Sequence, residues 1–177
     1  MDYYKKDQLL AAVDKNDTVL KEIDKWEAHE KGILHRGFTV CLFYQDKMIL
    51  QHRKHPVFDQ VFDLTCSSHP YFKDGGLQKT EDAVIETLKR EWDIVLDDLS
   101  SPLQHKGHIY YQAEDPLSIY KEHEICHLYC ADIDKLPSPN FDFAYGFSLM
   151  TKDQIMDKKA PIRSVFAPWV PLLLAIL

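Results

Sequence analysis

Two glutamates that lie close together in the sequence are well suited to acid/base or metal chemistry. The segment from 121 to 129 reads KEHEICHLY, so a strand there would point Glu122, Glu124 and Cys126 to one face. Adjacent carboxylates on one face repel each other, and one pKa rises unless a cation lies between them. The pair therefore predicts a metal site or a general acid/base, whereas solvated acids on an edge strand are the plainer alternative.

Three histidines lie in segments that would let them approach the same ion. His69 precedes Pro70 and follows a run of small residues, so few side chains crowd its imidazole. His29 and His35 are six residues apart with Gly32 between them, so no single helix face holds both. Each histidine alone has an ordinary explanation as a hydrogen-bonded residue. Together with the glutamates they predict a mixed nitrogen and oxygen shell, which suits zinc, manganese or iron.

The elements that must position these residues are strands and helices in irregular alternation. Residues 38–51 predict a hairpin around a polar turn at 45–47, and 81–92 predict a helix with apolar residues at helical spacing. A loop at 73–76 leads into that helix. We expect further strands at 109–112 and 123–131, and further helices at 153–158 and near the C-terminus. This order predicts an α/β fold of the mixed α+β type.

Residues 7–28 are ambiguous from their own pattern. Their composition favours a helix throughout. Residues 14–17, Asp-Lys-Asn-Asp, form a good turn, however, and would divide the segment into a hairpin and a short helix. Both alternatives stay open on the residues alone.

Length and composition predict one ordinary globular domain over residues 1–177. Of the 177 residues, 45% are hydrophobic and 28% are charged. The formal net charge of −7 argues against a nucleic-acid partner. Segment 165–177 is very apolar, but it contains two prolines and is too short to cross a bilayer, which needs about 20 residues. We expect it to dock on the domain and expect no membrane anchor.

The cysteines and the N-terminal residues bear on the cellular compartment. No Cys-x-x-Cys pair is present, and buried free thiols are typical of a reducing compartment. Residues 1–6, MDYYKK, have no apolar core after their charges, so we expect no secretory signal. These features predict a cytoplasmic protein, and they leave both a monomer and a homodimer open.

Five short segments occur in the order and rough spacing of a known family. They are HRGF at 35–38, CSSHP at 66–70, EDAVI at 81–85, EHEIC at 122–126 and APW at 167–169. The chain resembles the type 1 isopentenyl diphosphate isomerases from about residue 7 to its C-terminus. The resemblance implies a Nudix-like fold, with a mixed β-sheet flanked by helices, and a hairpin at residues 7–20. It implies an isomerase of isoprenoid biosynthesis that interconverts isopentenyl and dimethylallyl diphosphate.

The resemblance also assigns metal and diphosphate ligands by motif position. One divalent metal, Mn²⁺ or Zn²⁺, would be bound by His29, His35, His69, Glu122 and Glu124. Glu91 would help to hold a Mg²⁺ that also contacts the substrate, a small isoprenoid diphosphate. The diphosphate would be clamped by Lys25, Arg53 and Lys54.

The chemistry of a double-bond shift explains the remaining assignments. A proton must add to an unactivated alkene carbon, which creates a tertiary carbocation, and a second proton must leave from the neighbouring carbon. By resemblance, Glu124 would exchange one proton with hydrogen-bond support from Tyr111, and residue 67 would work opposite it. Trp169 would face the hydrocarbon, where an indole stabilises a desolvated cation by roughly 2 kcal/mol.

The chain departs from the family in the residues that would line the site. Ser67 stands where the family has a catalytic cysteine, and a hydroxyl ionises far less readily than a thiol, whose pKa is about 8.5. Cys66 is adjacent, but it would point to the opposite face. Thr87 stands where the family has a diphosphate-binding arginine, and residues 61–64, VFDL, replace a Trp-Thr-Asn stretch. A diphosphate-binding paralogue without isomerase activity is therefore one alternative.

A Nudix hydrolase is the other alternative. The hydrolase motif needs Arg-Glu, an apolar residue, any residue and then Glu-Glu on one helix to gather Mg²⁺. Arg90, Glu91 and Trp92 fit that pattern, but Ile94 and Val95 replace the Glu-Glu pair. The sequence therefore favours the isomerase.

Overall fold

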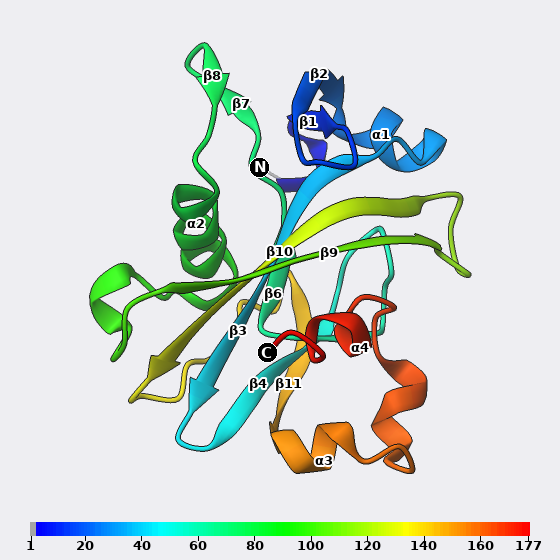
Figure 1. Ribbon diagram of the computed structural model, residues 1–177. Helices are drawn as coiled ribbons and strands as arrows, with labels where there is room; N and C mark the ends of the chain where they lie inside the picture. Colours follow the sequence, from blue (N-terminus) through cyan, green and yellow to red (C-terminus); the bar gives the residue numbers. More distant parts are fainter. Residues whose placement is uncertain (1–2) are drawn as a thin grey trace.

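Nine strands form one sheet around which the rest of the chain is arranged (Figure 1). The structure, a computed structural model, describes residues 3–177. The expectation of no secretory signal concerns residues 1–6, and the first two of these lie outside the described residues. The sheet contains β1 (Leu9–Val13), β2 (Val19–Asp24), β3 (His35–Tyr44), β4 (Lys47–Arg53), β5 (Phe62–Asp63), β6 (Cys66–Ser68), β9 (Gln104–Glu114), β10 (Lys121–Ile133) and β11 (Ala144–Thr151). A small second sheet pairs β7 (Phe72–Lys73) with β8 (Gly76–Leu77). The helices are α1 (Lys25–Lys31), α2 (Thr80–Trp92), α3 (Lys152–Met156) and α4 (Val170–Leu173).

The large sheet is mixed, which confirms the predicted fold class. β10 pairs with β3 in parallel and with β9 antiparallel. The pairs of β3 with β1, β4 and β6 are antiparallel. β3 lies at the centre of the sheet, and its residues 37–42 are all buried because both of its faces are covered.

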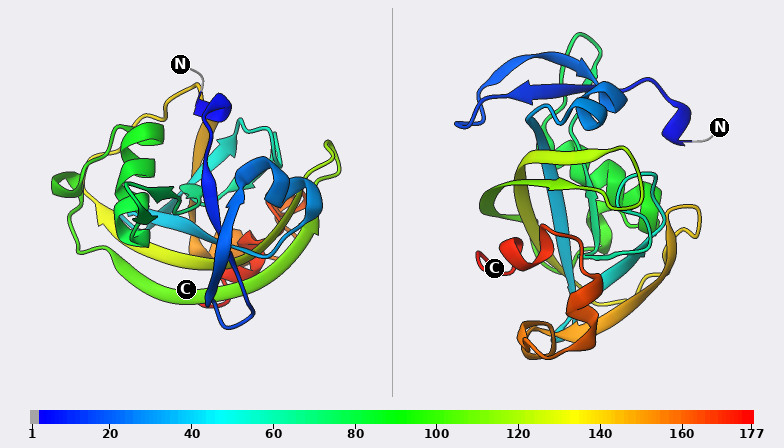
Figure 2. Two further views of the ribbon diagram at one scale, coloured as in Figure 1. Left: turned by 90° about the horizontal axis from the view of Figure 1, so that it is seen from above. Right: turned by 90° about the vertical axis from the view of Figure 1, so that its right-hand side faces the viewer.

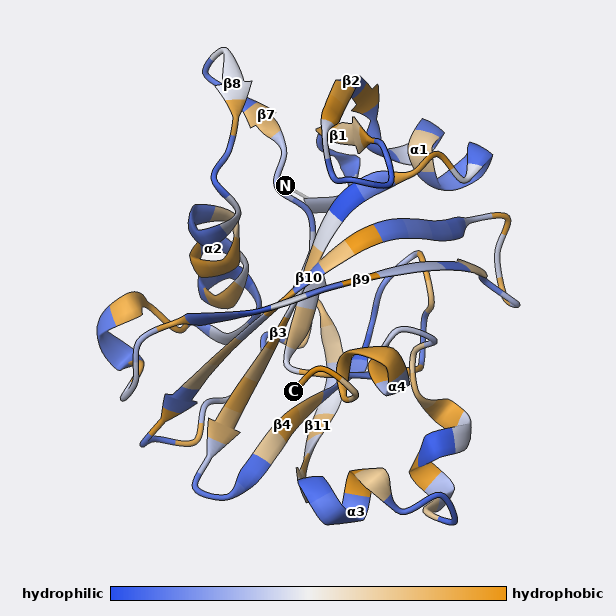
Figure 3. Ribbon diagram, viewed as in Figure 1, coloured by the Kyte–Doolittle hydropathy of each residue, from blue (hydrophilic) through white to orange (hydrophobic). Residues whose placement is uncertain are grey.

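A helical layer covers each face of the sheet. On one face, α2 packs Ala83, Val84 and Leu88 against β3 residues such as Val40 and Leu42. On the other face, α4 and the residues before it pack against Cys41, Leu50 and Leu128. Figure 3 shows the apolar colour concentrated on β3, β4 and α4. The C-terminal apolar segment therefore docks on the sheet, as expected. No helix within residues 3–177 is long and apolar enough to span a membrane.

The N-terminal segment forms a hairpin followed by a short helix, so the helical alternative for residues 7–28 is wrong. β1 and β2 pair antiparallel, and Asp14 Oδ1 accepts hydrogen bonds from the backbone N–H groups of Asn16 and Thr18. Asp17 has a φ of 62°, which this turn requires. This local turn outweighs the helical propensity of the composition. The hairpin and α1 lie at one end of the molecule, opposite α3 (Figures 1 and 2).

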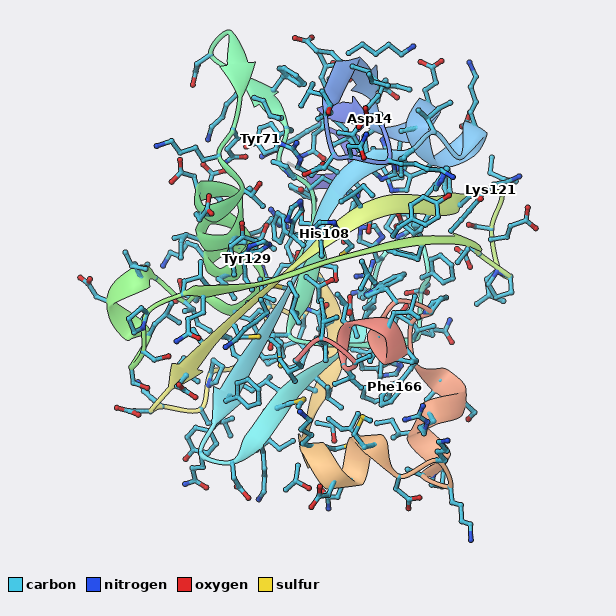
Figure 4. The ribbon with its side chains drawn as sticks, viewed as in Figure 1. Asp14, Tyr71, His108, Lys121, Tyr129 and Phe166 are labelled. Atoms are coloured by element: carbon cyan, nitrogen blue, oxygen red, sulfur yellow. The ribbon has the colours of Figure 1, made fainter. Side chains whose placement is uncertain are left out.

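Most of the other expected elements are confirmed, with two differences. Three strands, β5, β6 and β11, were not predicted, and the loop at 73–76 is the turn of the β7–β8 hairpin. Figure 4 shows Tyr71, beside that hairpin, at the same end of the molecule as Asp14. The backbone of Tyr71 forms a bridge with Leu10 of β1. All four cysteines are free and buried, as predicted.

Candidate metal and diphosphate site

Three imidazoles converge between α1, the start of β3 and the loop after β6. Gly32 ends α1 with a φ of 62°, and the chain turns there so that His29 and His35 face each other across the bend. The Nδ1 atoms of His29 and His35 lie 2.6 and 2.7 Å from the carbonyl oxygens of Lys25 and Ile33. Both rings therefore donate from Nδ1 and direct Nε2 into the site. The Nε2 atoms of His35 and His69 are 3.2 Å apart.

Two carboxylates of β10 reach the same point. Glu122 and Glu124 lie on one face of the strand, as the alternation predicted, and both are buried. Glu122 Oε2 is 3.4 Å from His29 Nε2 and 3.7 Å from His35 Nε2. Glu124 Oε1 is 2.8 Å from His69 Nε2. Residues from four separate segments, α1, β3, the loop after β6 and β10, thus place nitrogen and oxygen donors around one small volume.

The donor set fits a divalent metal. The ligand atoms of His29, His35, His69 and Glu122 all lie within 4.8 Å of one another. Within residues 3–177, His29 Nε2 and Glu122 Oε2 are buried and have no hydrogen-bond partner. Buried polar atoms without partners are costly, and a cation between them would satisfy both. In known metal sites, a ligating histidine donates its other ring N–H to a carboxylate or a backbone carbonyl, which fixes the orientation of the ring. The carbonyls of Lys25 and Ile33 do the same for His29 and His35.

The charges of the site shift the pKa values of its groups in opposite directions. Burial, followed by the charge of Glu122, raises the pKa of Glu124 to about 7. Burial alone would also raise the pKa of Glu122, but His29 and the other imidazoles lower it to about 2. Burial and the neighbouring imidazoles lower the pKa of His35 to about 3. Of the two glutamates, Glu124 therefore holds a proton more readily than Glu122.

Tyr111 and Gly37 hold Glu124 in position. The Tyr111 hydroxyl, on the neighbouring strand β9, donates a hydrogen bond of 2.7 Å to Glu124 Oε2. On the other side, a Cβ atom at Gly37 would lie 2.1 Å from Glu124 Oε1. The carboxylate therefore occupies the space that any other residue at position 37 would fill.

A small pocket, with a cavity volume of about 20 Å³, adjoins this cluster and brings together most of the residues assigned from the sequence. It is lined by the predicted residues Lys25, Arg53, Ser67, His69, Glu91, Tyr111, Glu122, Glu124 and Trp169, and also by Tyr3, His55, Ser68 and Arg90. Lys54 points elsewhere, and its ammonium group donates to the carbonyl of Phe141 beside a separate surface hollow. The pocket therefore combines cations, hydroxyls and an indole around the two glutamates.

Asp63 fixes two of the pocket residues. Its carboxylate is fully buried and accepts hydrogen bonds of 2.9 Å from Arg53 Nη1 and 2.8 Å from Trp169 Nε1. The guanidinium of Arg53 also lies 5.3 Å from the centre of a Trp169 ring. The VFDL stretch at 61–64 thus supplies the anchor that sets the positions of Arg53 and Trp169.

Ser67 lies on β6, opposite Thr39 of β3. Its hydroxyl is 2.7 Å from Thr39 Oγ1, which is in turn 3.4 Å from Cys126 Sγ. Cys66 points into the core beneath α2, on the other face of the strand, so it cannot replace a thiol at position 67.

Glu91 and Lys25 are buried at the cationic side of the pocket. Glu91 accepts from Arg90 Nη2 at 2.7 Å and from Gln51 Nε2 at 3.1 Å. Lys25 donates to Gln8 Oε1 at 3.1 Å, and burial lowers the pKa of Lys25. Both side chains are therefore held by neutral or opposite-charge neighbours within the pocket.

Several residues of the site were missed from the sequence. Gly37 and Ser68 lie in quoted segments, but their roles depend on contacts across the sheet. Asp63 is a carboxylate in an apolar stretch, which was the available signal for a buried anchor. Arg90 was considered only as part of the hydrolase motif. Outside the cluster, His105, His108 and His127 form another group, in which His127 contacts His105 and Asp17.

Comparison with known proteins shows distant homology to isopentenyl diphosphate isomerases, although no family model matches the chain. Isopentenyl-diphosphate Delta-isomerase 1 of Mesocricetus auratus is 28% identical over 187 residues, which cover 94% of this chain and 82% of that protein. The isomerase of Serratia proteamaculans is 25% identical, with 92% and 87% covered. Human isopentenyl-diphosphate delta-isomerase 2 is 31% identical, with 69% of this chain and 60% of that protein covered.

Solved structures show that the fold is Nudix-like. A Deinococcus radiodurans protein superposes with a TM-score of 0.71 at 16% identity, covering 94% of this chain and 97% of that one. A MutT Nudix hydrolase of Burkholderia pseudomallei gives a TM-score of 0.57 at 16% identity, covering 81% of this chain and 98% of that one. At these identities the similarity concerns the fold alone.

Proposed function

We propose that this distant homologue of isopentenyl diphosphate isomerases interconverts isopentenyl and dimethylallyl diphosphate as a single domain. The observation that carries the proposal is the position of Glu124. Its carboxyl group adjoins the histidine cluster, has a pKa raised to about 7, and lines the same pocket as Trp169, Lys25 and Arg53. A proton-exchanging acid, an indole and buried cations are the groups that the reaction needs.

Glu124 gives or takes the proton at one end of the allylic system. Tyr111 donates to its second oxygen and so orients the carboxyl group toward the pocket. Trp169 is 1% exposed, and its indole N–H is fixed by Asp63, so its ring presents a stable face to a developing carbocation. The buried pocket walls exclude water, which would otherwise capture the cation.

Ser67 handles the second proton in this proposal. The Ser67–Thr39 hydrogen bond orients the Ser67 hydroxyl, through which the proton can be relayed to or from a water molecule. Because an alkyl hydroxyl ionises much less readily than a thiol, turnover is slow, and a water molecule bound at Ser67 is an equivalent relay.

The metal ligands in this proposal are His29, His35, His69, Glu122 and Glu124 for one Mn²⁺ or Zn²⁺, and Glu91 for a Mg²⁺. When bound, such cations neutralise the diphosphate and shift the pKa values of nearby carboxyl groups. Lys25 and Arg53 bind the diphosphate directly, and both are buried where their charges are little screened.

A diphosphate-binding protein without isomerase activity is the second candidate, favoured by Ser67 and Thr87. The hydrolase alternative has less support. α2 ends at Trp92, so Ile94 and Val95 follow the helix and provide no carboxylates at the hydrolase positions. Ile94 is also buried in the core.

The test is to incubate the protein and a Ser67→Cys variant with Mg²⁺ and isopentenyl diphosphate, and to follow the substrate by NMR. Dimethylallyl diphosphate from the unmodified protein supports the proposal, and we expect Ser67→Cys to be faster. Product from the variant alone would assign the native chain to the diphosphate-binding candidate. No product from either, with phosphate released from other diphosphates, would contradict the isomerase.

A further inference from the structure

The guanidinium of Arg90 lies over the short side chain of Thr87, at the wall of the pocket. Thr87 stands one helical turn before Glu91 on α2 and is 1% exposed. Its Oγ1 accepts a hydrogen bond of 3.2 Å from Arg90 Nη2, so the Arg90 guanidinium lies over the short threonine side chain. The small residue at position 87 therefore leaves room for the arginine three positions later.

The head of Arg90 is part of the pocket wall. Its Nη2 is 2.7 Å from Glu91 Oε1 and 3.5 Å from Ser68 Oγ. Its Cζ is 4.1 Å from the centre of the Tyr3 ring, which also lines the pocket. The guanidinium thus stands beside Glu91, the residue that we assign to Mg²⁺, and on the same pocket as Lys25 and Arg53.

One donor of Arg90 lacks a partner. Its Nε is buried and has no hydrogen-bond partner within residues 3–177. A buried N–H without an acceptor costs free energy. The Nε and Nη atoms of arginine form a planar fork that fits two oxygens of a phosphate. A phosphate oxygen is therefore the acceptor that this position would accommodate.

We propose that Arg90 is a diphosphate-binding residue that supplies the third cation of the pocket, replacing an arginine expected at position 87. The inference rests on the proposed function, because it takes the pocket as a diphosphate site. It adds that Lys25 and Arg53 are insufficient. Arg53 is paired with Asp63, and Arg90 with Glu91, so each arginine brings only part of its charge to the diphosphate, and a third cation beside Lys25 and Arg53 is needed.

Calorimetric titration with inorganic pyrophosphate in the presence of Mg²⁺ tests the inference. We expect Arg90→Ala to weaken binding by roughly 10- to 100-fold, as the loss of a charge-assisted pair of hydrogen bonds implies. Arg90→Lys, which keeps the charge and loses the fork, should bind with intermediate affinity. Lys89→Ala is the matched control, because Lys89 is exposed and pairs with Asp93 on the same helix. It should bind pyrophosphate like the unmodified protein.

A second variant separates a binding role from a structural role. Thr87→Arg combined with Arg90→Ala should recover most of the lost affinity, since the guanidinium returns from the neighbouring turn. Equal affinity of Arg90→Ala and the unmodified protein would overturn the inference, as would absence of pyrophosphate binding by the unmodified protein. Tight pyrophosphate binding that depends on Arg90, without formation of dimethylallyl diphosphate, would uphold the inference while refuting the isomerase.

Discussion

Replacing Asp63 by alanine should destabilise the protein more than replacing any exposed acidic residue, because Asp63 neutralises the buried guanidinium of Arg53. Asp63 and Arg53 have exposed fractions of 0% and 4%, and Arg53 Nη1 is 2.9 Å from Asp63 Oδ2. Removing one partner of such a pair costs about 3–5 kcal/mol. For a chain of this length, 1 kcal/mol shifts Tm by roughly 2–4 °C, so we expect Tm to fall by about 6–20 °C.

Denaturant unfolding of three variants tests this reasoning. Asp134→Ala removes an exposed aspartate and should change stability by less than about 0.5 kcal/mol. Arg53→Met combined with Asp63→Ala removes both charges, so the double variant should be more stable than Asp63→Ala alone. The reasoning fails if Asp63→Ala loses under about 1 kcal/mol, or if the double variant is no more stable.

Three further predictions concern the metal, the pH dependence and the acid/base. A metal at 100 times its Kd should stabilise the protein by about 2.7 kcal/mol, measured by thermal unfolding with the metal and with a chelator. In His35→Ala, the difference between these two conditions should disappear. Burial raises the pKa of Asp17, but hydrogen bonds from His127 and Arg36 outweigh the effect of burial, so the net pKa is lowered. The stabilisation that Asp17 provides is therefore present above a pH of about 4 and is lost as the pH falls. Asp17→Asn should thus cost about 1 kcal/mol at pH 7, and the difference from the unmodified protein, measured by denaturant unfolding, should shrink below pH of about 4; a constant difference would contradict the pairing. Tyr111→Phe should lower kcat about tenfold with little change in KM. It should also shift the pH–rate profile to higher pH, because the Tyr111 hydrogen bond lowers the pKa of Glu124 and its removal lets that pKa rise. An unchanged profile would argue against this role of Tyr111.

The strand periodicity of β10 was sufficient to predict that Glu122 and Glu124 share a face, because the alternation of side chains along a strand is a local property. The helix α2 was predictable for the same reason. The convergence of His29, His35 and His69 depends on the pairing of β3 with β6 and β10, which the spacing of the histidines does not determine. The resemblance to a family supplied that information.

Other contacts could not be predicted because they depend on packing. The direction of Lys54 depends on where β4 ends and on the position of residue 141, which lies 87 residues away. The anchor at Asp63 requires Arg53 and Trp169 to meet across the sheet. Arg90 lies over the short Thr87 side chain at the pocket wall, a relation between two side chains that the helical spacing alone does not reveal.

The most direct test of the account is to supply the metal-loaded protein with isopentenyl diphosphate in D₂O and to measure deuterium in the product by NMR, beside a Glu124→Gln variant. We predict dimethylallyl diphosphate that carries deuterium in the methyl group formed from the alkene carbon, and no label or product with Glu124→Gln. Unlabelled, unchanged substrate from the metal-loaded native protein would contradict the assignment of this pocket as an isomerase site.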